Sequence, residues 1–215
     1  MNSSDLQKIK ESIVEEMFST KDINIWDPHE HKYFGPTTRS LVFYGDVNED
    51  RARLLISQIL HLESLSEEDQ ITIYLNTPGG SLTDGLAIHD VIKEVSCPVI
   101  IVAQGLCASA GLLIMAAADY KAASKNTTFF YHQPVVSDSS INSMNDMLSF
   151  HNHYEYCKDV SDSIILESSK MRKNLWNKFF AGQTSFYFDT KKALEFKIID
   201  EIVSSRKLNF KIKKD

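Results

Sequence analysis

The 215-residue sequence is poor in the features that mark several classes of protein. Its three cysteines, Cys97, Cys107 and Cys157, are an odd number at no metal-ligand spacing, so they indicate buried or incidental thiols in a reducing compartment. A net charge of -6 gives no field that attracts nucleic acid or an anionic membrane surface. No apolar run approaches the roughly 18 residues of a spanning helix, and the N-terminus lacks the apolar core of a signal peptide. We therefore expect a cytoplasmic protein that binds neither nucleic acid nor membranes.

What the chain has instead is a regular alternation of strand and helix patterns after residue 40. The composition, 43% hydrophobic and 24% charged, is that of an ordinary globular protein, and the length suits one sizeable domain. Short apolar segments predict strands at 41–45, 71–75 and 98–103, and amphipathic segments predict helices at 48–63 and 81–95. This order is typical of βαβ units with a parallel sheet core, so the predicted fold class is α/β.

The ends of the chain differ from this central pattern. Residues 1–40 read as a partly irregular N-terminal arm with a short helix expected over 3–18, and residues 205–215 as a basic, solvated C-terminal tail. Between them, 41–204 forms the expected domain. It includes a long polar helix over about 141–170, then the strand TSFYF, a helix from Asp189 and the closing segment KIIDEIV.

In a parallel sheet, reactive groups gather in loops at the carboxyl ends of the strands. The first such loop, NTPGGSLTDG, follows the strand ITIYL and opens a helix for which Ser81 is the expected N-cap. Gly79 and Gly80 permit backbone geometries that let their amides face an anion near a helix N-terminus. The alternative is that the glycine pair only makes a tight turn.

The second loop contains one hydroxyl, Ser109, in the apolar stretch GLCASAGLLIMAAAD. The preceding strand is expected to end at Gln104 and Gly105, and an apolar helix to begin near Ser109. A side chain at this place meets free amides and a helix dipole that favour developing negative charge. Ser109 is therefore either a nucleophile or an ordinary helix N-cap.

The third loop is FFYHQP, a predicted strand that ends in His132, Gln133 and Pro134. Histidine is the side chain best suited to take and return a proton near neutral pH, although a histidine at a strand end is usually structural. Six other histidines have no comparable setting: His29, His31, His61, His89, His151 and His153. His151 and His153 point to different helix faces, and we expect no metal site.

Together these segments resemble the proteolytic subunit of the Clp protease, a serine peptidase with a crotonase-like fold. YLNTPGGSLTDGLAIHDVI is similar to the family's Asn-Ser-Pro-Gly-Gly segment, GLCASAG to its nucleophile turn, and YHQP to its Ile-His-Gln-Pro. The resemblance extends more weakly from about Leu41 to Val203. It implies Ser109 as the nucleophile, His132 as its general base, and the backbone amides of Gly80 and Ala110 as the oxyanion hole.

The resemblance also implies an architecture and partners. The region 135–172 corresponds to the family's handle, a protruding long helix that interlocks two stacked seven-membered rings of identical subunits. The substrates implied are unfolded polypeptides, fed by a hexameric Clp ATPase unfoldase. No cofactor is expected in this chain, because ATP is used by that partner.

One catalytic residue of the family is missing. The family has an aspartate before its last strand and helix, and counting back from FKIID places Ala181 at that position. Asp189 instead reads as the N-cap of the last helix, since DTKKAL has the pattern of a capped helix start. A backbone carbonyl, Gln183, Thr184 or a carboxylate from elsewhere could orient His132 in its place.

Three functions are compatible with these residues. The leading hypothesis is a serine endopeptidase subunit of a Clp-type protease, with a triad weakened or altered by the missing aspartate. The alternative is a catalytically silent structural subunit of a mixed ring. A crotonase-like acyl-CoA enzyme is less favoured, because it leaves Ser109 and His132 together unexplained.

Overall fold

The structure, a computed structural model, describes residues 25–27, 32–34, 39–133, 143–179 and 185–203. The chain divides into two compact units, Met1–Ser40 and Leu41–Asp215. In the first unit, β1 (Ile25–Asp27) and β2 (Lys32–Phe34) form an antiparallel pair. The sequence pattern did not predict these strands, because three residues are too few to show a period. The helix expected over 3–18 and the tail 205–215 lie outside the described residues.

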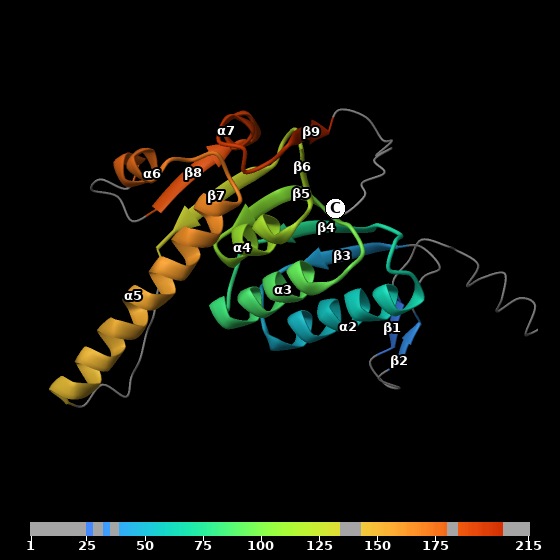
Figure 1. Cartoon of the computed structure of the whole chain (residues 1–215), viewed down its shortest axis with the longest axis horizontal. Helices are drawn as coiled ribbons and strands as arrows, with labels where there is room; N and C mark the ends of the chain where they lie inside the picture. The colour runs from blue at the N-terminus through green and yellow to red at the C-terminus, as the bar shows by residue number, and fades with distance from the viewer. Residues whose placement is uncertain (1–24, 28–31, 35–38, 134–142, 180–184, 204–215) are drawn as a thin grey trace, which may run out of the picture. The chain divides into compact units, whose positions relative to one another are not determined.

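The second unit alternates strands and helices around a seven-stranded sheet (Figure 1). The strands are β3 (Ser40–Tyr44), β4 (Ile71–Thr77), β5 (Val99–Ala108), β6 (Tyr120–Ser124), β7 (Thr128–His132), β8 (Ser185–Asp189) and β9 (Glu201–Val203). The helices are α2 (Glu49–Leu65), α3 (Leu82–Glu94), α4 (Ala110–Ala117), α5 (Met144–Glu167), α6 (Lys173–Phe179) and α7 (Thr190–Glu195). The predicted α/β fold class is confirmed.

The sheet has a parallel core with one antiparallel strand added. Its main path runs in the order β3-β4-β5-β6-β9, and β4–β5, β5–β6 and β6–β9 are parallel pairs. β7 leaves this path: it lies parallel to the end of β5 and antiparallel to β8. Because β4, β5 and β7 run in the same direction, their carboxyl ends meet at one edge of the sheet.

β5 continues beyond the place where the sequence pattern predicted its end. The strand was expected to stop at Gln104 and Gly105, but it runs to Ala108. Gly105 has a φ of 67°, a conformation that bends a strand without ending it, and the Asn76 side chain accepts a hydrogen bond from the amide of Leu106 at 3.2 Å. The bend lets one strand pair with β6 in its first part and with β7 at its end.

The helices cover the sheet with amphipathic faces. α2 buries Leu55, Ile59 and Leu62, which follow the spacing of one helix face, and the Asn48 side chain caps its start by accepting from the amide of Arg51. Burying each such side chain contributes about 1.5–3 kcal/mol to stability. α3 packs closely on α4, since a methyl group added at Gly85 would lie 3.0 Å from the Cβ atom of Ala110. These contacts fix the two helices that begin beside the candidate site.

α5 is the long helix that the sequence predicted, and it extends away from the sheet (Figure 1). Its last turns are anchored in the core by Cys157 and Ile165, which are buried. Its first turns expose the apolar side chains of Met144, Met147 and Leu148. Among the described residues, no helix combines the length and apolar character that crossing a bilayer requires.

Candidate active site

Ser109 stands alone between the last residue of β5 and the first residue of α4. Its backbone has φ 54° and ψ -122°, a conformation that non-glycine residues rarely adopt, at a cost of about 1–3 kcal/mol. Its amide donates to the carbonyl of Phe130 at 2.8 Å, and its carbonyl accepts from the amide of Leu112 at 2.9 Å. The side chain makes no capping hydrogen bond to α4. Ser109 therefore occupies the N-cap position of α4 without the side-chain hydrogen bond that an ordinary serine N-cap makes.

The glycine loop before α3 packs directly against this turn. Gly79 is buried with a φ of 91°, and a methyl group added there would lie 2.5 Å from the Cβ atom of Ser109 and 3.1 Å from the amide nitrogen of Ala110. Such distances are far shorter than van der Waals contact, so only glycine fits. The two loops predicted to carry the site are thus brought together by a residue without a side chain.

Hydrogen bonds hold the glycine loop on both sides of Gly80. The Gly79 amide donates to the buried Thr77 hydroxyl at 3.0 Å, and the Gly79 carbonyl accepts from the amide of Val47 at 2.8 Å. The Val47 carbonyl in turn accepts from the amide of Ser81 at 2.8 Å. Ser81 caps α3 as predicted, by accepting from the amide of Asp84. The importance of Thr77 was missed from the sequence, where it reads only as part of the loop that follows the strand ITIYL.

Two backbone amides are left without an acceptor in this arrangement. Within the described residues, no hydrogen bond is made by the amide of Gly80 or by that of Ala110, the first residue of α4. Gly80 is exposed, and its φ of 147° brings its α-carbon against Val47, where a methyl group would meet the Val47 carbonyl oxygen at 2.2 Å. Free amides at the start of a helix and in an adjoining glycine loop are suited to bind an anion.

His132 ends β7, the strand that runs beside the end of β5. Ala108 pairs with Phe130, and the Ser109 amide donates to the carbonyl of Phe130. His132 follows two residues after Phe130 on the same strand. The half-buried imidazole lies 5.4 Å from the Phe130 ring, centroid to centroid. The structure thus brings the three predicted loops to one edge of the sheet.

The imidazole is oriented by a backbone carbonyl. Its Nδ1 atom lies 2.6 Å from the carbonyl oxygen of Gln133. Because a carbonyl oxygen can only accept, this contact requires the proton on Nδ1 and leaves Nε2 free to act as a base. Within the described residues, no carboxylate contacts this ring, and Ser109 and His132 share no hydrogen bond. A backbone carbonyl was one of the substitutes expected for the missing aspartate.

The position expected for that aspartate, Ala181, lies outside the described residues, as do Gln183 and Thr184. Asp189 caps α7, since its Oδ1 atom accepts from the amide of Lys192 at 2.9 Å, which confirms the sequence interpretation. In the β7–β8 register Asp189 lies opposite Thr128, whereas His132 lies opposite Ser185. Four residues of extended strand separate the two positions by about 13 Å, so Asp189 does not orient His132.

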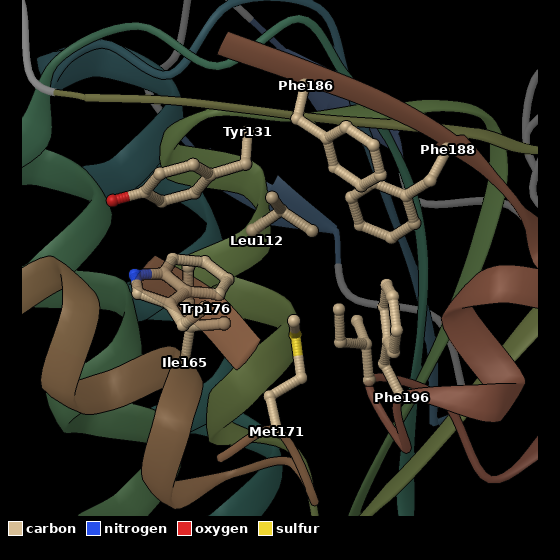
Figure 2. Close-up of a pocket in the computed structure, with 9 residues that line it drawn as sticks. Leu112, Tyr131, Ile165, Met171, Trp176, Phe186, Phe188 and Phe196 are labelled. Carbon is tan, nitrogen blue, oxygen red and sulfur yellow. The ribbon is translucent and has the colours of Figure 1, made fainter. Parts of the chain in front are cut away.

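A small apolar cavity lies behind β7 (Figure 2). Its lining consists of Leu112, Tyr131, Ile165, Met171, Trp176, Phe186, Phe188, Phe196 and Ile198. Side chains alternate along a strand, so Tyr131 faces this cavity while His132 faces the other side of β7. The cavity is a gap in the packed core and does not open onto Ser109.

Among the residues that the structure describes, the cysteines and the other histidines form no second cluster of reactive groups. All three cysteines are free and buried, as expected, and burial raises the pKa of the Cys107 thiol far above its usual range. His153 lies against Cys157 on α5, with Nε2 3.5 Å from Sγ. In the part of the chain that the structure describes, no three histidine, cysteine or acidic side chains gather as a metal site would require.

These observations define a class: an α/β protein of βαβ units in which a strained serine turn, a glycine pair and a histidine meet at one edge of the sheet. Comparison with known proteins identifies its family. Residues 36–206 match the family model described as Clp protease, and the chain therefore belongs to the Clp protease family.

Individual relatives agree with this assignment. The ATP-dependent Clp protease proteolytic subunit 2 of Treponema pallidum is 31% identical over 171 residues, which cover 79% of this chain and 84% of that protein. Subunit 3 from Rhizobium etli is 38% identical over 117 residues, 54% of this chain and 59% of the relative. Among solved structures, an Asn-to-Asp mutant of ClpP1 from Listeria monocytogenes matches with a TM-score of 0.71 at 28% identity, covering 79% of this chain and 94% of that chain.

Proposed function

We propose that this chain is a serine endopeptidase subunit of a Clp-type protease, with Ser109 as nucleophile and His132 as general base. The observation that carries the proposal is the strained, uncapped backbone of Ser109. A non-glycine residue held at φ 54° lowers the stability of the fold. The Ser109 hydroxyl does not offset this loss, because it makes no capping hydrogen bond to α4. A strained serine between a strand and a helix is the arrangement of a nucleophile turn.

The residues suit an acyl-transfer mechanism. Ser109 Oγ forms a bond to the peptide carbonyl carbon while His132 Nε2 takes its proton. The amides of Gly80 and Ala110 donate to the oxyanion, and each such donor is worth about 3 kcal/mol of transition-state stabilisation. The intermediate then expels the amine, which receives the proton from His132, and a water molecule releases the acyl group from Ser109.

The assembly and the partner are also proposals. The exposed apolar side chains of Met144, Met147 and Leu148 at the start of α5 support an interlocking helix between two rings of identical subunits. The relatives' description as ATP-dependent supports a hexameric Clp ATPase as the supplier of unfolded polypeptides. We expect a particle of fourteen subunits of 24.4 kDa, whose degradation of folded proteins requires that ATPase and ATP.

A silent structural subunit of a mixed ring is the second candidate. Two observations favour it: the carbonyl that replaces a carboxylate on His132, and the missing hydrogen bond between Ser109 and His132 within the described residues. Loss of the orienting aspartate in a triad can cost on the order of 10⁴-fold in rate. Hydrogen bonds between catalytic groups often form only in the substrate complex, so the serine peptidase remains the better-supported function.

One experiment separates the candidates. The purified full chain is assayed for fluorogenic peptide hydrolysis, for fluorophosphonate labelling mapped by mass spectrometry, and for particle mass. We expect labelling at Ser109 and a loss of hydrolysis of about 10³-fold or more in Ser109→Ala with the particle intact. Ser64→Ala, which removes an exposed hydroxyl that donates to the carbonyl of His61, is the matched control and should keep full activity.

Each contrary outcome has a distinct meaning. A particle of the expected mass that neither hydrolyses peptides nor reacts with the probe identifies the silent subunit. Thioester turnover that survives Ser109→Ala would favour the crotonase-like acyl-CoA enzyme.

A further inference from the structure

The strand that carries His132 is tied to α5 on both sides of the histidine. Tyr131 and Gln133 flank His132 and, because side chains alternate along a strand, both face away from the side on which the imidazole lies. Each of them makes a hydrogen bond to α5. The backbone on either side of His132 is thus held by two hydrogen bonds, both on the face of the strand opposite the imidazole.

The first tie is made by Tyr131. Its ring is 4% exposed and packs edge-on against Trp176, with the ring centroids 4.7 Å apart. Its hydroxyl donates to the Oδ1 atom of Asp162, and the other oxygen of that carboxylate lies 3.3 Å from the Nζ atom of Lys158. In Figure 2 the Tyr131 hydroxyl points away from Phe186 and Phe188. The bond therefore runs from the core-facing side of β7 to a charged, partly buried acceptor.

The second tie involves the residue whose carbonyl orients the imidazole. The Tyr154 hydroxyl donates to the Oε1 atom of Gln133 at 3.3 Å. Tyr154 and Asp162 are eight residues apart on α5, little more than two helical turns, so both lie on the face turned toward β7. The Gln133 side chain is thus held by Tyr154, while the Gln133 carbonyl accepts a hydrogen bond from the Nδ1 atom of His132.

We infer that α5 positions His132 in place of a triad carboxylate, with Asp162 acting through Tyr131 and Tyr154 acting through Gln133. This inference rests on the proposed function of His132 as general base. The family motif to which YHQP is similar has isoleucine before the histidine, a side chain that cannot donate a hydrogen bond. A chain with that isoleucine could not make the bond that Tyr131 makes to Asp162.

The expected role is positional, and these residues touch neither substrate nor reacting atoms. If the backbone of Gln133 were free to rotate, the Gln133 carbonyl would move away from the Nδ1 atom of His132, and the imidazole would turn or change tautomer. Loss of orientation alone lowers a rate by roughly ten- to a hundredfold. Because substrate contacts are unchanged, the loss falls on kcat and leaves KM nearly constant.

The test compares variants of the full chain in its assembled form. Tyr131→Phe keeps the ring against Trp176 and deletes only the hydroxyl, and Asp162→Ala deletes its acceptor. We expect each to lower kcat for a fluorogenic peptide by about tenfold or more with KM changed less than about twofold. The double variant should be no worse than either single variant, because both break the same bond. Asp162→Asn retains an acceptor oxygen and should restore most of the activity.

A spectroscopic readout tests the same inference without relying on activity. Solid-state NMR of particles labelled with ¹⁵N-histidine, assigned by comparison with His132→Gln, reports which ring nitrogen of His132 carries the proton. We expect the Nδ1–H form in the unaltered protein and a larger share of Nε2–H in Tyr131→Phe and Asp162→Ala. Tyr156→Phe, which removes an exposed hydroxyl from the same helix, is the matched control and should change neither kcat nor the spectrum.

The outcomes separate this inference from the proposed function. If the unaltered protein is inactive but Tyr131→Phe changes the His132 tautomer, the proposed function fails and the positioning role stands. If kcat and the spectrum are unchanged in both Tyr131→Phe and Asp162→Ala, the inference is overturned. Should Tyr131→Phe fail to assemble, Asp162→Ala, which leaves the core ring in place, decides the question.

Discussion

The two halves of the candidate site are built in different ways. The serine half is made of backbone: Ser109 is held by hydrogen bonds to main-chain atoms, and Gly79 packs against it without a side chain. The histidine half is made of side chains that reach across from α5, through Tyr131 and Gln133. The first half is fixed by local geometry, whereas the second depends on where a distant helix lies.

This difference indicates which changes the site can tolerate. The glycine loop before α3 is held by backbone contacts and has no alternative conformation that accommodates a larger residue. A single added methyl group therefore disrupts both the loop and the fold. A side-chain network can lose one hydrogen bond and keep the fold, with a smaller and more graded effect on catalysis. The predictions below test that contrast.

The largest effect is expected for Gly79→Ala. The new methyl group would lie 2.5 Å from the Cβ atom of Ser109 and would require a φ of 91° in alanine. We expect the free energy of unfolding to fall by about 3 kcal/mol or more, from backbone strain and overpacking together, with peptide hydrolysis lost. Urea denaturation and a peptidase assay measure the two effects.

Gly45→Ala is the control for this change. Gly45 has a similar φ of 99°, but the three atoms nearest to its added methyl group all belong to the flexible side chain of Arg51, the closest at 3.2 Å. Gly45→Ala should lower the free energy of unfolding through backbone strain but leave peptide hydrolysis intact. Equal losses of activity in both variants would contradict a special role for the approach of Gly79 to Ser109.

An intermediate, pH-dependent effect is expected for Tyr131→Phe. Burial, the hydrogen bond to Asp162 and the charge of that carboxylate raise the pKa of the Tyr131 hydroxyl above its usual value of about 10. Above that pH the unfolded chain loses this proton while the folded chain keeps it, so the stabilising effect of the hydroxyl is present below about pH 10 and is lost as the pH rises further. The variant should be less stable than the unaltered protein by about 2 kcal/mol at neutral pH.

The measurement is urea denaturation at pH 7 and at pH 10.5. The difference in unfolding free energy between the unaltered protein and Tyr131→Phe should narrow at the higher pH, while Tyr156→Phe should follow the unaltered protein at both. A gap that stays constant or widens would show that Tyr131 does not remain protonated in the folded state.

The smallest effect is expected for Asp189→Ala. Removing the cap of α7 should lower the free energy of unfolding by about 1 kcal/mol and leave kcat unchanged. Asp189→Asn caps nearly as well, so it should be close to neutral in both measurements. A large loss of activity in the asparagine variant would instead assign a catalytic role to the carboxylate.

The backbone half of the site could be predicted from the sequence because its determinants are local. Paired glycines before a capped helix, and a serine between an apolar strand and an apolar helix, are patterns within a few residues, and Gly79, Ser81 and Ser109 occupy the places that these patterns indicate. The same holds for the cap at Asp189. Strands β3 and β4 and helices α2 and α3 could be predicted for the same reason, from short-range periodicity.

The features that could not be predicted from the sequence depend on contacts between residues far apart in the chain. Tyr131 and Asp162 are 31 residues apart, and no local pattern distinguishes this pair from an ordinary core tyrosine and a surface aspartate. The continuation of β5 beyond Gly105 depends on Asn76 in the neighbouring strand. β6, with the sequence YKAAS, is too short and too polar to read as a strand, and only its pairing with β5 and β9 reveals it.

The backbone conformation of Ser109 limits which residue types can occupy position 109 without added strain. Glycine would relieve about 1 kcal/mol of strain, whereas a β-branched threonine fits a positive φ poorly. Mutational drift under selection for stability alone would therefore favour glycine, which lacks the hydroxyl. A subunit with no need for catalysis could replace Ser109 by glycine and gain stability in one substitution, whereas this chain has the less stable serine.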